Sequence, residues 1–190
     1  RAARRLGFEA LESRRLLAAQ YDFAVNLYAD ADGVPGELIA GDTVQAGETF
    51  FVEITAEDLR PGGLGLRSMG LHIYWDPETL REIDEPFNPL DPASSLMTSA
   101  FPLARAGTLD NEAGRIRYLT GGAVLSMDTG RAIGADGPER LSLLHFRALQ
   151  AAEYTPLTLQ PSGDVGFIPM RRYAQTDLSF KSQLITVVEA

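Results

Sequence analysis

The segment YADADGVPG, residues 28–36, is the stretch best suited to holding a metal ion. Asp30 and Asp32 stand just before a glycine, and calcium prefers carboxylate oxygens presented by a tight turn. In an EF-hand register, however, Tyr28 replaces the first aspartate and Ile39 replaces the bidentate glutamate. Because aspartate and glycine also favour ordinary turns, we expect a plain loop, with Asp30 and Asp32 as the candidates should calcium bind. No other cofactor is expected.

The sequence contains two histidines, His72 and His145, and no cysteine. Each histidine falls on the outward side of a predicted strand, where we expect it to be exposed. Neither the H-E-x-x-H pattern of zinc enzymes nor the G-x-S-x-G nucleophile turn occurs. A glycosidase carboxylate pair is defined by its spacing in three dimensions, so the sequence selects no such pair. We therefore assign no catalytic residue and do not expect an enzyme.

Three aromatic side chains, Tyr28, Phe51 and Tyr74, fall on the outward faces of predicted strands. Exposed aromatic rings anchor protein interfaces, and a row of them suits a carbohydrate. The alternative is that a second element or another subunit covers them. These three residues are the binding candidates.

From residue 20 onward the apolar residues follow the period of two that is typical of half-buried strands. In residues 21–29 one face carries Tyr21, Phe23, Val25, Leu27 and Ala29. The same pattern, bounded by turn-forming residues, recurs at residues 48–59, 114–122, 140–149, 155–160 and 182–190. With no long helical period in this part of the chain, the pattern predicts an all-β antiparallel sandwich or barrel.

The run SMGLHIYWDPETL, residues 68–80, predicts a strand that ends at a corner. Met69, Leu71, Ile73 and Trp75 should point inward. Pro77 cannot donate to a strand ladder and extends the residue before it, Asp76. One helical turn would then return Leu80 to the core, which makes Trp75, Asp76, Pro77 and Leu80 a structural corner.

The charge is unevenly distributed along the 190 residues, whose net charge is −9. Residues 1–19 carry five arginines and two glutamates, a charge of +3, which leaves −12 on the remainder. This balance predicts two parts, a basic N-terminal arm or targeting segment at 1–19 and a sandwich at 20–190. The acidity argues against nucleic acid. No apolar run is long enough to span a membrane or to form an ordinary signal peptide.

The arm has the composition of a short helix, and the alternative is a disordered terminus. Ordering it would require burial of its large apolar side chains. We expect these side chains to dock on the acidic domain of a neighbouring copy and so to act as an assembly arm: Leu6, Phe8, Leu11, Leu16 and Leu17. Such head-to-tail contacts can propagate into a fibre.

Four segments in order, GDTVQAGETFFVEI, MGLHIYWDPETLREID, GRIRYL and LSLLHFRAL, resemble cohesin domains. The match covers residues 40–190, with the corner at Trp75 to Leu80 and with Phe146 and Ala148 on a late strand. Residues 84–110, a Pro-rich insertion, and residues 161–183 fit no strand of that family. The resemblance implies a jelly-roll sandwich without catalytic residues that binds a dockerin module.

The segment FEALESRRLLAA, residues 8–19, resembles the F-E-x-L-E-x-R-x-L-L-x-A segment near the N-terminus of large exported proteins of planctomycete-type bacteria. That resemblance implies an extracellular or cell-surface location. Three functions stay open: a cohesin-like recognition or scaffolding module that binds a protein partner, a structural subunit of a surface fibre or layer that assembles through its arm, and a carbohydrate-binding module.

Overall fold

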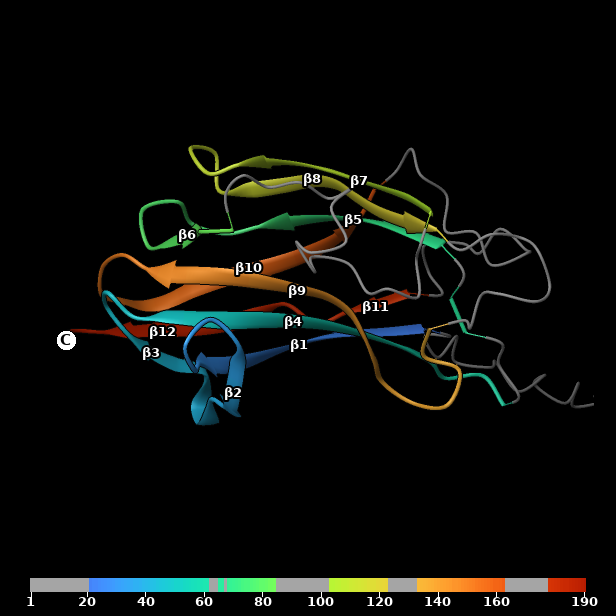
Figure 1. The fold of residues 1–190 in the computed structure, drawn as a ribbon, viewed down its shortest axis with the longest axis horizontal. Helices are drawn as coiled ribbons and strands as arrows, with labels where there is room; N and C mark the ends of the chain where they lie inside the picture. The colour runs from blue at the N-terminus through green and yellow to red at the C-terminus, as the bar shows by residue number, and fades with distance from the viewer. Residues whose placement is uncertain (1–20, 62–64, 67, 85–102, 123–132, 163–177) are drawn as a thin grey trace, which may run out of the picture.

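The computed structural model describes residues 21–61, 65–66, 68–84, 103–122, 133–162 and 178–190. These residues form two layers of strands packed face to face (Figure 1). One 3₁₀ helix, η1 (Ala40–Asp42), accompanies the strands in this part of the chain. The strands are β1 (Tyr21–Asp30), β2 (Pro35–Leu38), β3 (Thr43–Gln45), β4 (Thr49–Asp58), β5 (Ser68–Tyr74), β6 (Leu80–Glu82), β7 (Leu103–Asp110), β8 (Arg115–Gly122), β9 (Glu139–Ala148), β10 (Ala152–Pro161), β11 (Leu178–Phe180) and β12 (Gln183–Val188).

The first sheet has the strand order β11-β1-β4-β9-β6, with β2 added beside β1. The second sheet has the order β3-β12-β10-β5-β8-β7. Neighbours in both sheets are mostly antiparallel, and two pairs, β1 with β11 and β3 with β12, are parallel. This is an antiparallel jelly-roll sandwich: the alternating sequence predicts a sandwich or barrel, and the resemblance to cohesins implies the jelly-roll form.

The core lies between the sheets and is built from the inward residues of each strand. Tyr21, Phe23, Val25 and Leu27 of β1 are buried as predicted, and so are Phe50, Val52 and Ile54 of β4. Ala29 is exposed, contrary to the prediction, because β1 there pairs with the short strand β2 and reaches the turn at residues 31–34. The period of two therefore holds along β1 until that turn begins.

The strand β5 ends at the corner expected from the sequence. Trp75 is 5% exposed, and its ring meets Phe146 edge to face at 5.1 Å between centroids. The carbonyl of Asp76 accepts the backbone N–H of Leu80 at 3.0 Å, which closes one turn after the proline. Leu80 is fully buried and begins β6 in the other sheet. The corner thus transfers the chain from the second sheet to the first.

Two segments that fit no expected strand contribute strands at their ends. The last part of residues 84–110 is β7, the edge strand of the second sheet, and residues 85–102 lie outside the described residues. Within residues 161–183, β11 pairs with β1, while residues 163–177 lie outside them as well. β7 was missed because residues 103–108 lack a clear alternation of apolar and polar side chains, and β11 because three residues are too few to show a period.

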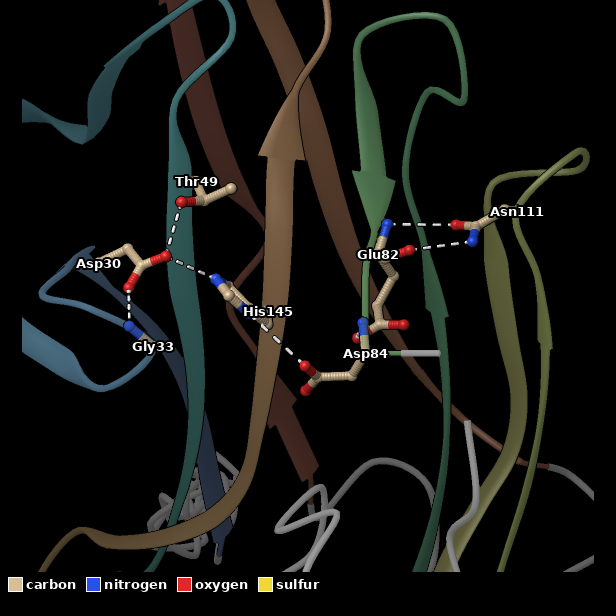
Figure 2. Close-up of polar contacts among 7 residues, drawn as sticks. All are labelled: Asp30, Gly33, Thr49, Glu82, Asp84, Asn111 and His145. Carbon is tan, nitrogen blue, oxygen red and sulfur yellow. Dashed lines mark hydrogen bonds and ion pairs between the residues drawn. The ribbon is translucent and has the colours of Figure 1, made fainter. Parts of the chain in front are cut away.

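A side chain joins the two sheets at the open edge of β6. Asn111 lies in the turn between β7 and β8, which pair as an antiparallel hairpin. Its Oδ1 accepts the backbone N–H of Glu82 at 3.1 Å, and its Nδ2 donates to the Glu82 carbonyl at 2.9 Å (Figure 2). One amide therefore takes the place of a neighbouring strand at this edge and covers backbone groups that would otherwise invite pairing.

Candidate binding face

The outer face of the second sheet is a continuous surface made by β12, β10, β5 and β8. Every second residue of each strand points outward. On this face most of those residues are apolar, aromatic or cationic. Register places Thr158, Tyr74 and Arg115 side by side across three strands, and Pro156 beside Leu184. Of these outward residues, Tyr154 is 66% exposed and Leu184 is 54% exposed. Large exposed side chains on one flat sheet are typical of an interaction surface.

Aromatic rings gather where β5 meets β8. The rings of His72 and Tyr118 meet edge to face at 4.9 Å, and Tyr74 lies 6.2 Å from His72. The guanidinium carbon of Arg117 lies 5.6 Å from the centre of the Tyr118 ring, within the range of a cation–π contact. Tyrosine and arginine are the residue types that protein interfaces favour most. We refer to His72, Tyr74, Arg117 and Tyr118 as the aromatic cluster.

A bulge in β8 produces this cluster. Leu71 pairs with Leu119 and Ile73 pairs with Ile116, so two residues of β8 face the single residue His72. Those two residues are Arg117 and Tyr118, both of which are exposed. Tyr118 takes a φ of 54°, a left-handed conformation that costs a non-glycine residue about 1–2 kcal/mol. Bulges of this kind commonly redirect a side chain at a functional site.

The charge at the edge of this face is partly neutralised. Arg115 donates two hydrogen bonds to Asp110, from Nε at 3.1 Å and from Nη2 at 2.9 Å. The backbone N–H of Ala113 and then Arg115 hold the pKa of Asp110 below its ordinary value. The guanidinium of Arg117 adds a weaker lowering of the pKa of Asp110 and lies over the Tyr118 ring. A partner with a carboxylate near Arg117 would suit this face.

The outer face of the first sheet differs, because its polar groups bond to one another. Arg140 Nε donates to Glu53 at 2.6 Å, and Asn26 and the Tyr28 hydroxyl donate to the other oxygen of Glu53 at 3.2 and 3.1 Å. Burial, with Glu53 adding to it, raises the pKa of Tyr28. Tyr28, a predicted binding residue, is therefore half-buried with its hydroxyl engaged.

Phe51 is the predicted binding residue that another side chain covers, which is the alternative stated for the three aromatic residues. Its side chain points outward, opposite His145, but it is only 5% exposed. The imidazole of His145 stacks on the ring at 4.2 Å with 9° between the planes. The alternation of the strand predicts the outward direction of Phe51 correctly. It cannot predict that His145, from another strand, covers the ring.

His145 itself is largely buried, not exposed as expected, and lies between two carboxylates (Figure 2). Its Nε2 is 2.9 Å from Asp30 and its Nδ1 is 3.5 Å from Asp84. The hydroxyl of Thr49 is the main group that lowers the pKa of Asp30, whereas burial raises the pKa of Asp84. This cluster links β1, β4, β9 and the segment after β6, and the sequence analysis missed it.

The two calcium candidates, Asp30 and Asp32, differ in their surroundings. One oxygen of Asp30 accepts the Gly33 N–H at 2.7 Å, and the other accepts from Thr49 at 2.6 Å and contacts His145. Asp32 is exposed at the turn with a φ of 56°. Within the described ranges, no three histidine, cysteine, aspartate or glutamate side chains come close enough to hold a metal ion. Asp30 serves the turn and the His145 cluster.

We expect chelation with EDTA to leave the melting temperature unchanged, because we expect residues 28–36 to form a plain loop. A calcium ion bound to the folded state would raise stability, and its removal would lower the melting temperature. Differential scanning fluorimetry with EDTA, and then with added calcium, measures this. A fall on chelation that calcium reverses, and that Asp32→Ala abolishes, would show that Asp30 and Asp32 bind the ion.

The predicted assembly arm, Leu6, Phe8, Leu11, Leu16 and Leu17, lies outside the described residues. Tyr74, the third predicted binding residue, lies in the aromatic cluster. Tyr118 was not among the predicted binding residues, because nothing in the sequence indicates that a tyrosine in a strand takes a left-handed conformation.

In the part of the chain that the structure describes, no helix is long and apolar enough to cross a membrane.

The fold is similar to that of solved cohesin domains. The seventh ScaB type I cohesin of Pseudobacteroides cellulosolvens matches with a TM-score of 0.55 and 10% identity, over 90% of this chain and 94% of that one. A cohesin module of a Clostridium perfringens family 33 glycoside hydrolase gives 0.54 and 16% identity, over 91% and 100%. The third ScaC cohesin of Acetivibrio cellulolyticus, solved with the ScaB dockerin, gives 0.52 and 15%, over 77% and 93%.

No protein-family model matches the sequence, and no curated protein does. At these low identities the similarity defines the fold alone. The chain is thus a cohesin-like jelly-roll sandwich.

Proposed function

We propose that the protein is a non-catalytic recognition or scaffolding module that binds a dockerin-like protein partner through the outer face of its second sheet. The observation that carries this proposal is the contrast between the two outer faces. The first sheet satisfies its polar groups internally and buries Phe51, whereas the second presents the aromatic cluster, Tyr154 and Leu184. Among the described residues, the outer face of the second sheet is the one that combines exposed aromatic rings with an arginine lying against them.

The fold supports a protein as the partner. Among the similar structures, the third ScaC cohesin of Acetivibrio cellulolyticus is in complex with the ScaB dockerin, and two Clostridium thermocellum cohesins, OlpC and OlpA, are in complex with Doc435 and Doc918. Because residues 8–19 resemble the N-terminal segment of large exported bacterial proteins, we further propose that the module lies outside the cell or at its surface.

Isothermal titration calorimetry of the full chain against these three dockerins tests the proposal. We expect at least one to bind, and we expect Arg117→Glu to weaken that binding about tenfold or more, as removal of a central interface residue does. Arg147→Glu is the matched control, because Arg147 is an exposed arginine on β9 of the other sheet. We expect this control to change the affinity by less than about twofold.

Absence of binding to all three dockerins would contradict the dockerin-like reading. Equal losses in the two variants would contradict the assignment of the face. A glycan array then distinguishes the carbohydrate-binding alternative, which requires binding that is lost in Tyr74→Ala. Light scattering of the full chain distinguishes the fibre alternative, which requires assembly that is lost when residues 1–19 are deleted.

A further inference from the structure

Tyr118 is the only non-glycine residue with a positive φ inside a strand of the described chain. The two others, Asp32 and Asp42, lie in a turn and in η1. Glycine and asparagine adopt this conformation more cheaply than tyrosine does. A large exposed ring at such a position therefore weakens the fold locally, and its flanking residues Ile116 and Leu119 already supply the buried contacts of β8.

We propose that Tyr118 is the anchor residue of the binding face and that His72 positions it, through an acceptor that only the neutral imidazole provides. The role as anchor rests on the proposed function. The positioning of Tyr118 by His72 is a property of the isolated chain and does not depend on it.

The geometry of His72 supports this role. The backbone N–H of Tyr118 donates to Nδ1 of His72 at 3.2 Å, so this nitrogen carries no proton in the observed arrangement. The same imidazole contacts the Tyr118 ring edge to face at 4.9 Å. One side chain thus holds both the backbone and the ring of the residue at the bulge. A leucine or alanine at position 72 has neither an acceptor for the Tyr118 N–H nor an aromatic ring to contact the tyrosine.

Protonation of His72 would remove this support. A proton on Nδ1 would face the N–H of Tyr118, which places two donors against each other. The described groups that face His72 include Tyr74 on β5, Arg117 and Tyr118 on β8 and Gln160, its neighbour in register on β10. Asp110, a carboxylate at the end of β7, is engaged by Arg115. Histidine changes its charge between pH 5 and 8, so mild acid should loosen the anchor.

Nuclear magnetic resonance of the full chain tests the positioning role without a partner. We expect the Tyr118 amide resonance to move with the protonation of the His72 ring between pH 8 and 5. The scalar coupling between the amide and α protons of Tyr118 should be smaller at pH 8 than in extended neighbours and should change on acidification. In His72→Asn, whose amide oxygen keeps an acceptor at every pH, the change should disappear. A Tyr118 amide that ignores the titration of His72 would overturn the inference.

Thermal unfolding separates an anchor from a structural residue. We expect Tyr118→Asn to melt at or above the wild-type temperature, because asparagine tolerates the left-handed backbone better than tyrosine. Thr120→Asn, at an extended position of the same strand, is the control and should melt lower. If Tyr118→Asn melts clearly below the wild type, the tyrosine serves the fold and the inference is wrong.

Binding gives the remaining readout. With the dockerin that binds, Tyr118→Asn should lose about tenfold or more in affinity despite its undiminished stability. The wild-type affinity should fall from pH 7.5 to 5.5, and His72→Asn should remove that pH dependence. Unchanged affinity in Tyr118→Asn would refute the anchor role. If no dockerin binds at all, the proposed function fails, and the resonance and melting results still decide whether His72 positions a strained Tyr118.

Discussion

Trp75→Ala should lower the free energy of unfolding by about 3–5 kcal/mol, the usual cost of deleting a large buried aromatic side chain. The indole is 5% exposed and packs edge to face on Phe146 at the corner where the chain changes sheets. Its removal would leave a cavity between the two sheets. Urea denaturation followed by circular dichroism measures the loss.

Two further variants sharpen this result. Among the described residues the indole N–H has no hydrogen-bond acceptor, so Trp75→Phe discards an unsatisfied donor and should cost clearly less than Trp75→Ala. Tyr154→Ala removes an aromatic ring that is 66% exposed and should cost less than about 0.5 kcal/mol. A loss below about 1 kcal/mol for Trp75→Ala would mean that the ring does not support the core.

Gly114→Ala is expected to be as damaging, for a different reason. A Cβ at this position would lie 2.2 Å from the carbonyl oxygen of Trp75 and 2.8 Å from Cδ of Pro77. Backbone and a proline ring cannot move aside as a flexible side chain can. The φ of 60° adds about 1–2 kcal/mol of left-handed strain. Together with the overlap, typically about 1–3 kcal/mol, the loss should reach about 2–5 kcal/mol.

Gly47→Ala separates these two contributions. Gly47 has a φ of 91°, but a Cβ there meets nothing within 4 Å. This control should lose only the conformational part, about 1–2 kcal/mol. Equal losses for Gly114→Ala and Gly47→Ala in urea denaturation would show that the corner at Trp75 and Pro77 yields readily, and that the close approach of the β7–β8 turn is not a constraint.

The sandwich could be predicted because its strands place apolar residues toward the core at every second position. The inward residues of β5 and β4 alternate strictly, and Pro77 marks the end of β5 in the sequence itself. β7 and β11 could not be predicted, since edge strands need only one neighbour and tolerate irregular patterns. The sheet order also arises from pairs distant in sequence, which alternation does not specify.

The candidate site was harder to predict than the fold. Tyr74 is recognisable because it stands on the outward side of a clear strand. Tyr118 is not, because a one-residue bulge in β8 brings it to the face and changes the register there. Asp30 and His145 lie far apart in the chain, so their contact depends on the pairing of β1 and β9 with β4. No local pattern contains that information.

The two parallel pairings have a consequence for the order in which the protein folds during synthesis. β11 completes the first sheet beside β1, and β12 joins β3 to β10 in the second. A ribosome must therefore make the chain beyond Leu178 before either sheet has its full set of strands. Until then β1 and β10 expose unpaired backbone in a chain that already carries most of its core residues. Pairings between such distant segments form slowly, so this interval is the period of greatest exposure to aggregation.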